Sequence, residues 1–338
     1  GSYNTATGRK ALFSNTTGAS NTASGQNALY ANTTASDNVA IGKQALTANT
    51  TGGTNTAVGK GAAYSNTTGA SNTASGQNAL YTNTTGSQNV AIGKDALHLN
   101  TTGSQNVASG FEALVWNTTA SNNTATGYQA LKSNTTGADN TGVGYSALRT
   151  NTTGSYNTAI GMYALYSNTT GTFNTASGRN ALQNNTTGIN NTATGYEALK
   201  VSTTGQYNTA TGYHALHSTT TGEGNTVLGY SAGSSITTGD FNLCLGYNAQ
   251  PSSATVDDEV VLGDSHIATL RCNTSTISSL SDARDKTEVE PSPLGIDFIN
   301  TLNPVKFLWQ SREGNTKDGT YEIGFIAQEL QEVQKESN

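Results

Sequence analysis

A strict repeat of 17 residues runs through most of the chain and constrains its fold more than any other feature. The copies follow one another without insertion or deletion, and their consensus is N-T-A-x-G-x-x-A-L-x-x-N-T-T-G-x-x. A disordered linker has no reason to hold such a register, whereas a solenoid must present the same residue type to the same place in its neighbours. The first asparagine of the unit, which we number slot 0, recurs at Asn4, Asn21, Asn38, Asn55, Asn72, Asn89, Asn106, Asn123, Asn140, Asn157, Asn174, Asn191, Asn208, Asn225 and Asn242.

The residues at fixed slots favour a parallel β-roll with one coil per copy. Slot 4 is Gly and slot 7 is Ala in every copy, which suits a positive φ at the first and a narrow core at the second. Slot 3 carries β-compatible residues such as Ile41, Val58 and Ile92, which suit a half-buried surface and give one β-branched residue per coil to the core beside the slot-8 Leu. The N-T-T-G segment has residue types that favour turns. Asparagines stacked at the same slot predict hydrogen-bonded ladders along the axis.

The core of such a roll would be thin. Each coil offers only Ala, Leu and one β-branched residue, so a lone roll would be marginally stable. Neighbouring strands lie about 4.8 Å apart, which makes the repeat array a rod about 70 Å long. Three rolls packed side by side would bury the remaining apolar faces. We therefore predict an all-β fold, a parallel β-solenoid (β-roll) repeat array that forms a homotrimer.

Charge separates the array from the C-terminal part of the chain. Residues 1–250 contain nine Lys or Arg against seven Asp or Glu, whereas residues 251–338 contain seven against fifteen. Neither part has a basic patch suited to phosphate backbones, so we expect no nucleic-acid partner, and no stretch is apolar enough for membrane insertion. The two cysteines, Cys244 and Cys272, are too few for a disulfide framework and are expected to be small buried hydrophobes.

We predict three regions along the chain. Residues 1–250 form the shaft or head, and residues 251–280 form a β neck that intertwines the three chains, because two short strand-like runs lie there. Residues 281–338 form a small α+β segment. Amphipathic patterns at 293–302 and 326–333 predict its helices.

The repeat unit resembles that of phage fibre proteins. It is similar, more loosely, to the heads of trimeric autotransporter adhesins, which are trimers of left-handed parallel β-rolls. This resemblance covers residues 1–250 and implies a structural virion fibre protein for host attachment. A bacterial trimeric surface adhesin is one alternative. An ice-binding solenoid is another, since flat Thr arrays can order water, but the Thr slots vary here.

Three ordered motifs in the last region resemble the C-terminal intramolecular chaperone of endosialidase tailspikes and many phage fibres. They are S-D-A-R-D-K at 281–286, L-N-P-V-K-F-L-W at 302–309 and G-F-I-A-Q-E-L at 324–330. The resemblance implies that this segment drives trimerisation and then cuts itself off at the Leu280–Ser281 bond. It also implies Ser281 and Lys286 as the catalytic pair of a single-turnover serine autoprotease.

That chemistry makes physical demands on both residues. A Ser hydroxyl is a weak nucleophile that needs a base, and Lys serves as one only when burial or nearby positive charge keeps it neutral. Taken alone, the motif also fits a solvated turn and helix start. The family's domain continues through further strands and a long helix, so we expect an incomplete domain ending at Asn338. The start in mid-repeat likewise predicts a fragment of a longer array.

Aromatic residues gather at slot 5 and predict a stripe along the solenoid. They are a candidate platform for sugar rings, and Trp116 is a candidate contact of the same kind. The alternative, which we favour, is a packed ladder or trimer-interface packing. The stripe comprises Phe111, Tyr128, Tyr145, Tyr196, Tyr213, Tyr230 and Tyr247.

Other polar residues give weaker signals. His214 and His217 lie three apart, but we find no Cys or carboxylate beside them to complete a metal-binding set. Asp95 and Glu112 share slot 6 in adjacent coils, and paired carboxylates can hydrolyse glycosides, although a solvated face is the commoner meaning. We therefore expect no metal, no cofactor and no metabolic enzyme.

The expected partners and location depend on the fibre interpretation. Besides the homotrimer, they are a host cell-surface glycan or receptor and other virion tail proteins. The expected location is the virion tail fibre, assembled in the host cytoplasm, where few cysteines suit the reducing conditions. The adhesin alternative would place the chain on a bacterial cell surface.

Overall fold

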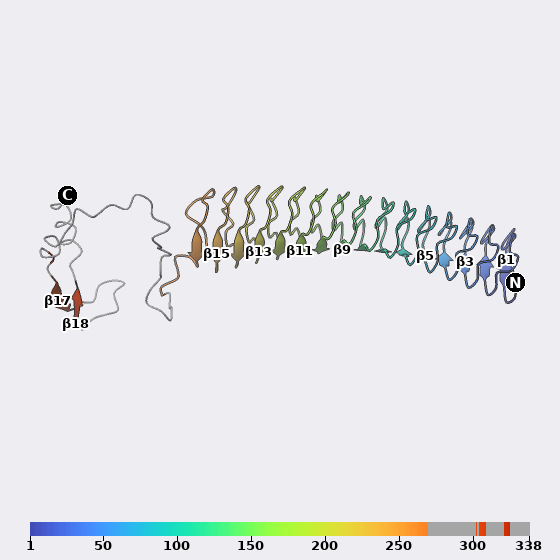
Figure 1. The fold of residues 1–338 in the computed structure, drawn as a ribbon, viewed down its shortest axis with the longest axis horizontal. Coiled ribbons are helices and arrows are strands. Elements are labelled where there is room, and N and C mark those ends of the chain that lie inside the picture. Colours follow the sequence, from blue (N-terminus) through green and yellow to red (C-terminus); the bar gives the residue numbers. More distant parts are fainter. Residues whose placement is uncertain (270–301, 303, 309–320, 325–338) are drawn as a thin grey trace, which may run out of the picture. The chain divides into compact units, whose positions relative to one another are not determined.

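The computed structural model describes residues 1–269, 302, 304–308 and 321–324. The chain divides into two compact units, Gly1–Leu270 and Arg271–Asn338. In the first unit the backbone winds into a stack of coils with one short strand in each, as Figure 1 shows. In the second unit the described strands β17 (Val305–Leu308) and β18 (Tyr321–Gly324) pair antiparallel, with Val305 opposite Gly324.

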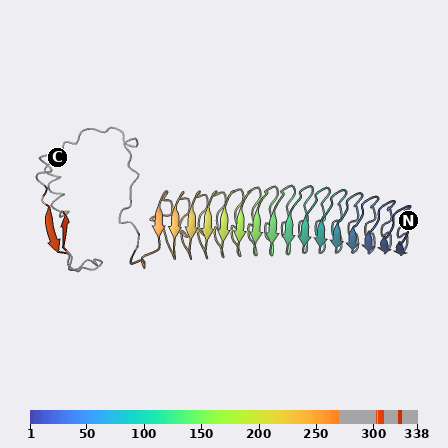
Figure 2. The ribbon, with the colours of Figure 1, turned by 60° about the horizontal axis from the view of Figure 1, so that its bottom comes forward.

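The strands of the first unit form one 16-stranded parallel sheet in the order of the sequence (Figure 2). Each strand has three residues, and the bounds are β1 (Thr5–Thr7), β2 (Thr22–Ser24), β3 (Val39–Ile41), β4 (Thr56–Val58), β5 (Thr73–Ser75), β6 (Val90–Ile92), β7 (Val107–Ser109), β8 (Thr124–Thr126), β9 (Thr141–Val143), β10 (Thr158–Ile160), β11 (Thr175–Ser177), β12 (Thr192–Thr194), β13 (Thr209–Thr211), β14 (Thr226–Leu228), β15 (Leu243–Leu245) and β16 (Val260–Leu262).

The register of the sheet equals the period of the sequence. Ala91 lies opposite Ala108, and every other pair in the sheet keeps the same offset of 17 residues. The predicted parallel β-solenoid is therefore confirmed. The stack also continues past residue 250, because β16 pairs with β15 through Leu243 and Val260. The described part of the predicted neck thus begins with one more coil, while its intertwining stays a prediction.

Most coils bury three apolar side chains, from slots 2, 7 and 8. In the coil of β6 these are Ala91, Ala96 and Leu97, all fully buried. Slot 3 behaves differently, since 45% of Ile92 and 48% of Ile160 are exposed. Slot 3 is thus half-buried, as its residue types predicted, but its side chains lie on the outer face of the sheet and not in the core of the single chain. Side chains alternate along a strand, so burying slot 2 turns slots 1 and 3 outward.

The turn after each strand depends on backbone with positive φ. Gly110 in slot 4 has φ 147°, and a Cβ there would lie 2.2 Å from the Gly127 carbonyl oxygen. The glycine requirement predicted from the sequence is thus confirmed. Leu97 in slot 8 also has a positive φ of 50°, which is unusual for a residue with a branched side chain. Its full burial and the hydrogen bond from its N–H to the Ala113 carbonyl (3.0 Å) hold it there.

Two asparagine ladders run along the stack and confirm the predicted hydrogen bonding. In slot 0, Asn106 donates its side-chain amide to the Ala120 carbonyl (2.9 Å) and accepts the backbone N–H of Asn123 (3.0 Å). In slot 11, the Asn117 amide donates to the Asn100 side chain (2.8 Å) and also to the Ala120 carbonyl (2.9 Å). One slot-14 carbonyl per coil therefore joins both ladders and closes the turn.

Candidate functional site

The outer face of the parallel sheet carries a broken row of exposed apolar side chains. A single chain leaves these apolar side chains in water on a regular parallel sheet, which marks a surface suited to a partner. Ser or Thr fills the same slot in several intervening coils, so the face is not a continuous Thr array. The exposed slot-3 members are Ile41, Val58, Ile92, Ile160, Leu228 and Leu262.

The slot-5 aromatics form the stripe that the sequence predicted, in two stacks. Phe111, Tyr128 and Tyr145 stack with ring centroids 5.5 and 4.9 Å apart. The second stack runs through Tyr196, Tyr213, Tyr230 and Tyr247 at 5.1, 5.0 and 5.3 Å. Met162 and Arg179 occupy the slot between the stacks.

Stacking decides what the stripe can bind. A ring inside a stack has both faces covered and offers only its edge, whereas a sugar ring packs on a face. Lys94 covers the outer face of Phe111 at 5.6 Å, and Arg179 covers that of Tyr196 at 5.9 Å. Among the described residues, no ring or cation covers the outer face of Tyr247. The structure thus favours the ladder for most of the stripe and leaves one ring suited to a ligand.

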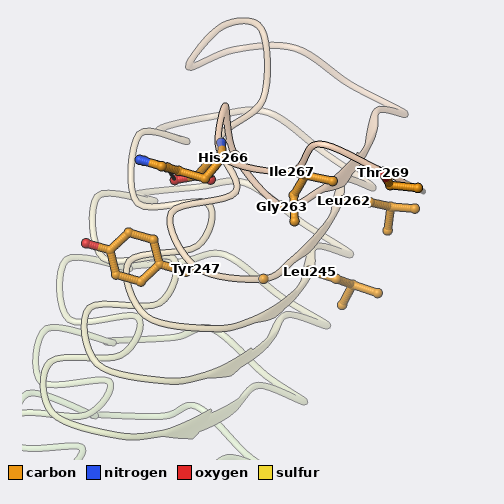
Figure 3. Close-up of a pocket in the computed structure, with 9 residues that line it drawn as sticks. Leu245, Tyr247, Leu262, Gly263, His266, Ile267 and Thr269 are labelled. Atoms are coloured by element: carbon orange, nitrogen blue, oxygen red, sulfur yellow. Dashed lines mark hydrogen bonds and ion pairs between the residues drawn. The ribbon is translucent and has the colours of Figure 1, made fainter. Parts of the chain in front are cut away.

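Tyr247 lies at the rim of a hollow of about 740 Å³ beside the last coil (Figure 3). Leu245 and Leu262, from successive strands, lie on one side with Ile267 and Thr269, while Tyr247 and His266 lie on the other. The His266 ring nitrogen Nδ1 is 2.9 Å from the Asp264 carboxylate. The His266 backbone N–H, and then its ring, lower the pKa of Asp264. The hollow combines an apolar floor with a charged edge, which suits a ligand with both characters.

Trp116 lines a second, smaller hollow of about 330 Å³ with Leu99, Val115 and Lys132. Half of the Trp116 side chain is exposed. The Lys132 ammonium is 2.6 Å from the Glu112 carboxylate and lowers its pKa by a hydrogen bond. A flat ring beside a fixed ion pair is an arrangement that carbohydrate ligands can use.

The carboxylates of Asp95 and Glu112 have separate partners. Glu112 accepts a hydrogen bond from Gln129 (2.8 Å) besides the one from Lys132. Asp95 accepts a bond from Asn78 (3.1 Å) and lies 3.5 Å from His98. Both groups are held in polar networks on the surface, so the arrangement favours the structural interpretation over a glycosidase pair.

The expectation that no carboxylate lies beside His214 and His217 is wrong. Glu197 Oε2 is 3.2 Å from His214 Nε2 and 3.4 Å from His217 Nε2. Glu197 precedes His214 by one period and occupies the same slot 6, so the repeat itself carried the signal that the sequence reasoning missed. These three residues are the one group of potential metal ligands found in the described part of the chain.

The predicted autoprotease residues Leu280, Ser281 and Lys286 lie outside the described residues. So do Cys272 and the helices expected at 293–302 and 326–333, apart from residue 302, which lies in neither a helix nor a strand. The other cysteine, Cys244, is buried as predicted, and burial raises its pKa to about 11. Within the described residues we find no helix with the length and hydropathy that a bilayer crossing requires.

Comparison with known families matches residues 281–337 to the family described as chaperone of endosialidase. No curated protein sequence and no solved structure matches the chain. The family is the one that the three C-terminal motifs predicted, and the match begins at Ser281. A parallel β-solenoid of 17-residue repeats, followed by a segment similar to this chaperone, fits the description of a phage tail fibre-type protein.

Proposed function

We propose that this chain is a structural fibre protein of a virion that trimerises through its solenoid face and serves host attachment. Its C-terminal segment acts as an intramolecular chaperone that promotes the trimer and cleaves the Leu280–Ser281 bond, with Ser281 as nucleophile and Lys286 as base. The observation that carries the proposal is the order of a regular solenoid and then a chaperone-of-endosialidase match.

The exposed row on the sheet supports trimerisation. The core of one chain is Ala, Ala and Leu in most coils, while about half of each of Ile92 and Ile160 stays exposed outside it. Burying apolar surface contributes about 25 cal/mol per Å², so covering this row with two further copies would add stability that the thin core lacks. Native mass spectrometry of the Ser281→Ala chain, which should stay uncut, should show a species near three times 34.8 kDa, and the wild type should show a trimer lighter by the released fragments.

Paired substitutions test which face makes the trimer. Ile92→Asp with Ile160→Asp should shift the chain toward monomer, because each trimer would have to bury six carboxylates. The matched control is Thr102→Asp with Thr170→Asp, which places the same charges at exposed slot-13 positions of the same coils. A wild-type monomer would refute the trimer. If the double variant Ile92→Asp with Ile160→Asp still formed a trimer, the interface would have to lie on another face of the solenoid.

Cleavage has its own test. The freshly expressed wild-type chain should release a C-terminal fragment that begins at Ser281, and Ser281→Ala and Lys286→Ala should prevent its release. Ser279→Ala is the control, since it changes a hydroxyl two residues away and should still be cut. A trimer with no cut in any variant would separate chaperoning from proteolysis.

The chemistry of the surface supports a glycan as the receptor class. Tyr247 and Trp116 are the aromatic rings that lie at hollows and combine an exposed face with charged neighbours. Binding of the chain to host cells or glycan arrays should fall with Tyr247→Ala or Trp116→Ala. Tyr156→Ala, which alters a ring stacked on Phe173 outside both hollows, should leave binding unchanged.

The chaperone match favours the virion fibre over a bacterial adhesin head. The ice-binding alternative is addressed by a thermal hysteresis assay, and the apolar interruptions of the Thr face predict a negative result.

A further inference from the structure

Glu197, His214 and His217 come together because two successive coils present them to one place. Glu197 and His214 both occupy slot 6, with positive φ of 55° and 53°. The backbone N–H of His214 donates to the Tyr196 carbonyl at 2.9 Å, and that of Glu197 donates to the Arg179 carbonyl at 3.0 Å. The coil-to-coil hydrogen bonds thus hold both residues in position, and His217 lies within the same turn as His214.

The atoms that face one another have the spacing of metal ligands. Glu197 Oε2 lies 3.2 Å from His214 Nε2 and 3.4 Å from His217 Nε2. A tetrahedral ion with bonds of about 2.0–2.1 Å holds its ligand atoms about 3.3 Å apart. The three potential ligand atoms all lie within 4.8 Å of one another. Two imidazoles and one carboxylate form a ligand set that zinc and related divalent ions accept.

The surrounding groups leave the inward atoms available. Lys200 Nζ and Asn180 Nδ2 both bond to the other carboxylate oxygen, Oε1, at 2.8 and 3.1 Å, and so orient Oε2 toward the imidazoles. His214 Nε2 is buried and makes no hydrogen bond, although Glu197 Oε2 lies 3.2 Å away. The Tyr213 ring stacks on His214 with centroids 4.1 Å apart and limits its rotation. A buried polar atom without a partner calls for an explanation, and a bound ion supplies one.

The same neighbours also shift the pKa values of two of these side chains. Burial alone would raise the pKa of the Glu197 carboxyl, but hydrogen bonds from Lys200, Asn180 and Tyr196 outweigh burial and lower the pKa to about 2. Burial, and to a lesser extent the charge of His214, lowers the pKa of His217. The Lys200 ammonium opposes a cation, so the affinity should be moderate.

We propose that Glu197, His214 and His217 bind one divalent transition-metal ion of the zinc class between the coils of β12 and β13. The ion cross-links two coils through three protein ligands and leaves a fourth position for water or an outside ligand. Oxygen-preferring ions such as Mg²⁺ or Ca²⁺ are not expected, because two of the three ligands are imidazole nitrogens.

Zinc titration of the full chain, prepared without a histidine tag and freed of metal by a chelator, tests the proposal. Calorimetry should show one Zn²⁺ per chain, and Co²⁺ should give the visible absorption of a tetrahedral nitrogen–oxygen site. His217→Ala and Glu197→Gln should each weaken binding roughly tenfold or more, because each removes one of three ligands. Mg²⁺ should not compete.

The matched control is His98→Ala. His98 occupies slot 9 of its coil, as His217 does, and it lies 3.5 Å from a carboxylate, that of Asp95. The coil of His98 has Asp95 in slot 6, whereas the coil of His217 has His214 there, so only the latter offers two imidazoles. This variant should bind Zn²⁺ like the wild type, and circular dichroism should show that all variants keep the solenoid. Absence of a stoichiometric site, or equal binding by wild type and His217→Ala, would overturn the proposal and leave a polar His–Glu network.

Discussion

A buried asparagine at slot 0 of every coil from β2 to β15 is stable because each polar atom of its amide has a partner in the stack. The Asn106 amide donates to the Ala120 carbonyl, and its oxygen accepts the backbone N–H of Asn123. Buried amides cost free energy only when they lack partners. The slot-11 ladder shows what happens when the asparagine is missing. Ser202 replaces Asn there, and its buried hydroxyl has no hydrogen-bond partner.

Removing one ladder amide should therefore be costly. Asn106→Ala leaves the buried N–H of Asn123 without its acceptor, which should lower the free energy of unfolding by about 1–3 kcal/mol. Chemical denaturation followed by circular dichroism measures the change. Thr102→Ala, at an exposed site of the neighbouring coil, should change stability little. Equal stability of both variants would show that the slot-0 ladder is dispensable.

Slot 2 of the β9 coil is Gly142, whereas the two neighbouring coils have a buried Ala in this slot. Gly142 in β9 lies between Ala125 and Ala159, and a Cβ there would lie 3.3 Å from both the Ala147 carbonyl oxygen and the Leu131 side chain. Gly142→Ala should raise stability by about 0.4–1 kcal/mol, because it restricts the unfolded chain and fills the column. Thermal unfolding measures the change, and a lower midpoint would mean that Leu131 has no room to move.

At the scale of the coil, two glycine slots that look alike in sequence have different roles. Slot 4 is Gly in all coils, with φ between 117° and 147° in the coils of β1 to β15. Slot 14 has no such φ at Gly103, and Ala fills the same slot at positions 35 and 120. The first glycine is required by the backbone dihedral, whereas the second is a preference of a crowded turn.

Alanine substitutions should separate these roles. Gly110→Ala puts a Cβ into the Gly127 carbonyl at a positive φ, so it should destabilise the coil by about 1–3 kcal/mol or more. A Cβ at Gly103 would also lie 2.2 Å from a carbonyl oxygen, that of Ala120, but the backbone there has no positive φ, and two other coils already carry Ala in this slot, so Gly103→Ala should cost less. Thermal unfolding of the two variants gives the comparison. A larger loss for Gly103→Ala would contradict the assignment.

On the scale of the first unit, the stack is a series of interchangeable coils, because each strand pairs only with its neighbours at an offset of 17. Deleting residues 72–88 removes one period and joins Ser71 to Asn89 in register. We expect a solenoid shorter by about 4.8 Å with an unchanged unfolding midpoint, measurable by small-angle scattering and calorimetry.

A deletion that is not a whole period supplies the contrast. Removing residues 72–80 takes Ala74, Ala79 and Leu80 from the core but leaves the following N-T-T-G turn, so the midpoint should fall. If the 17-residue deletion were as damaging as the shorter one, the coils would not be equivalent units.

The repeat by itself determined the fold of the first unit, because a 17-residue period without slips allows only a structure in which every copy meets the next in the same way. Slot 4 as a positive-φ glycine, the asparagine ladders and the buried Ala and Leu of slots 7 and 8 were all predictable from that periodicity. The three motifs after residue 280 likewise predicted the family that matches residues 281–337.

Only the tertiary structure decided which way each strand faces. A three-residue strand is too short for its alternation to show in the sequence, so the sequence does not reveal that Ile92 and Ile160 lie on the outer face while Ala91 and Ala159 lie in the core. The structure also brought Glu197 beside His214 and His217, residues that a search along the sequence treated as isolated. The physical reason is the same in both cases. Residues 17 apart are neighbours in a coil stack, and contacts between coils depend on the direction of each side chain, which periodicity alone does not specify.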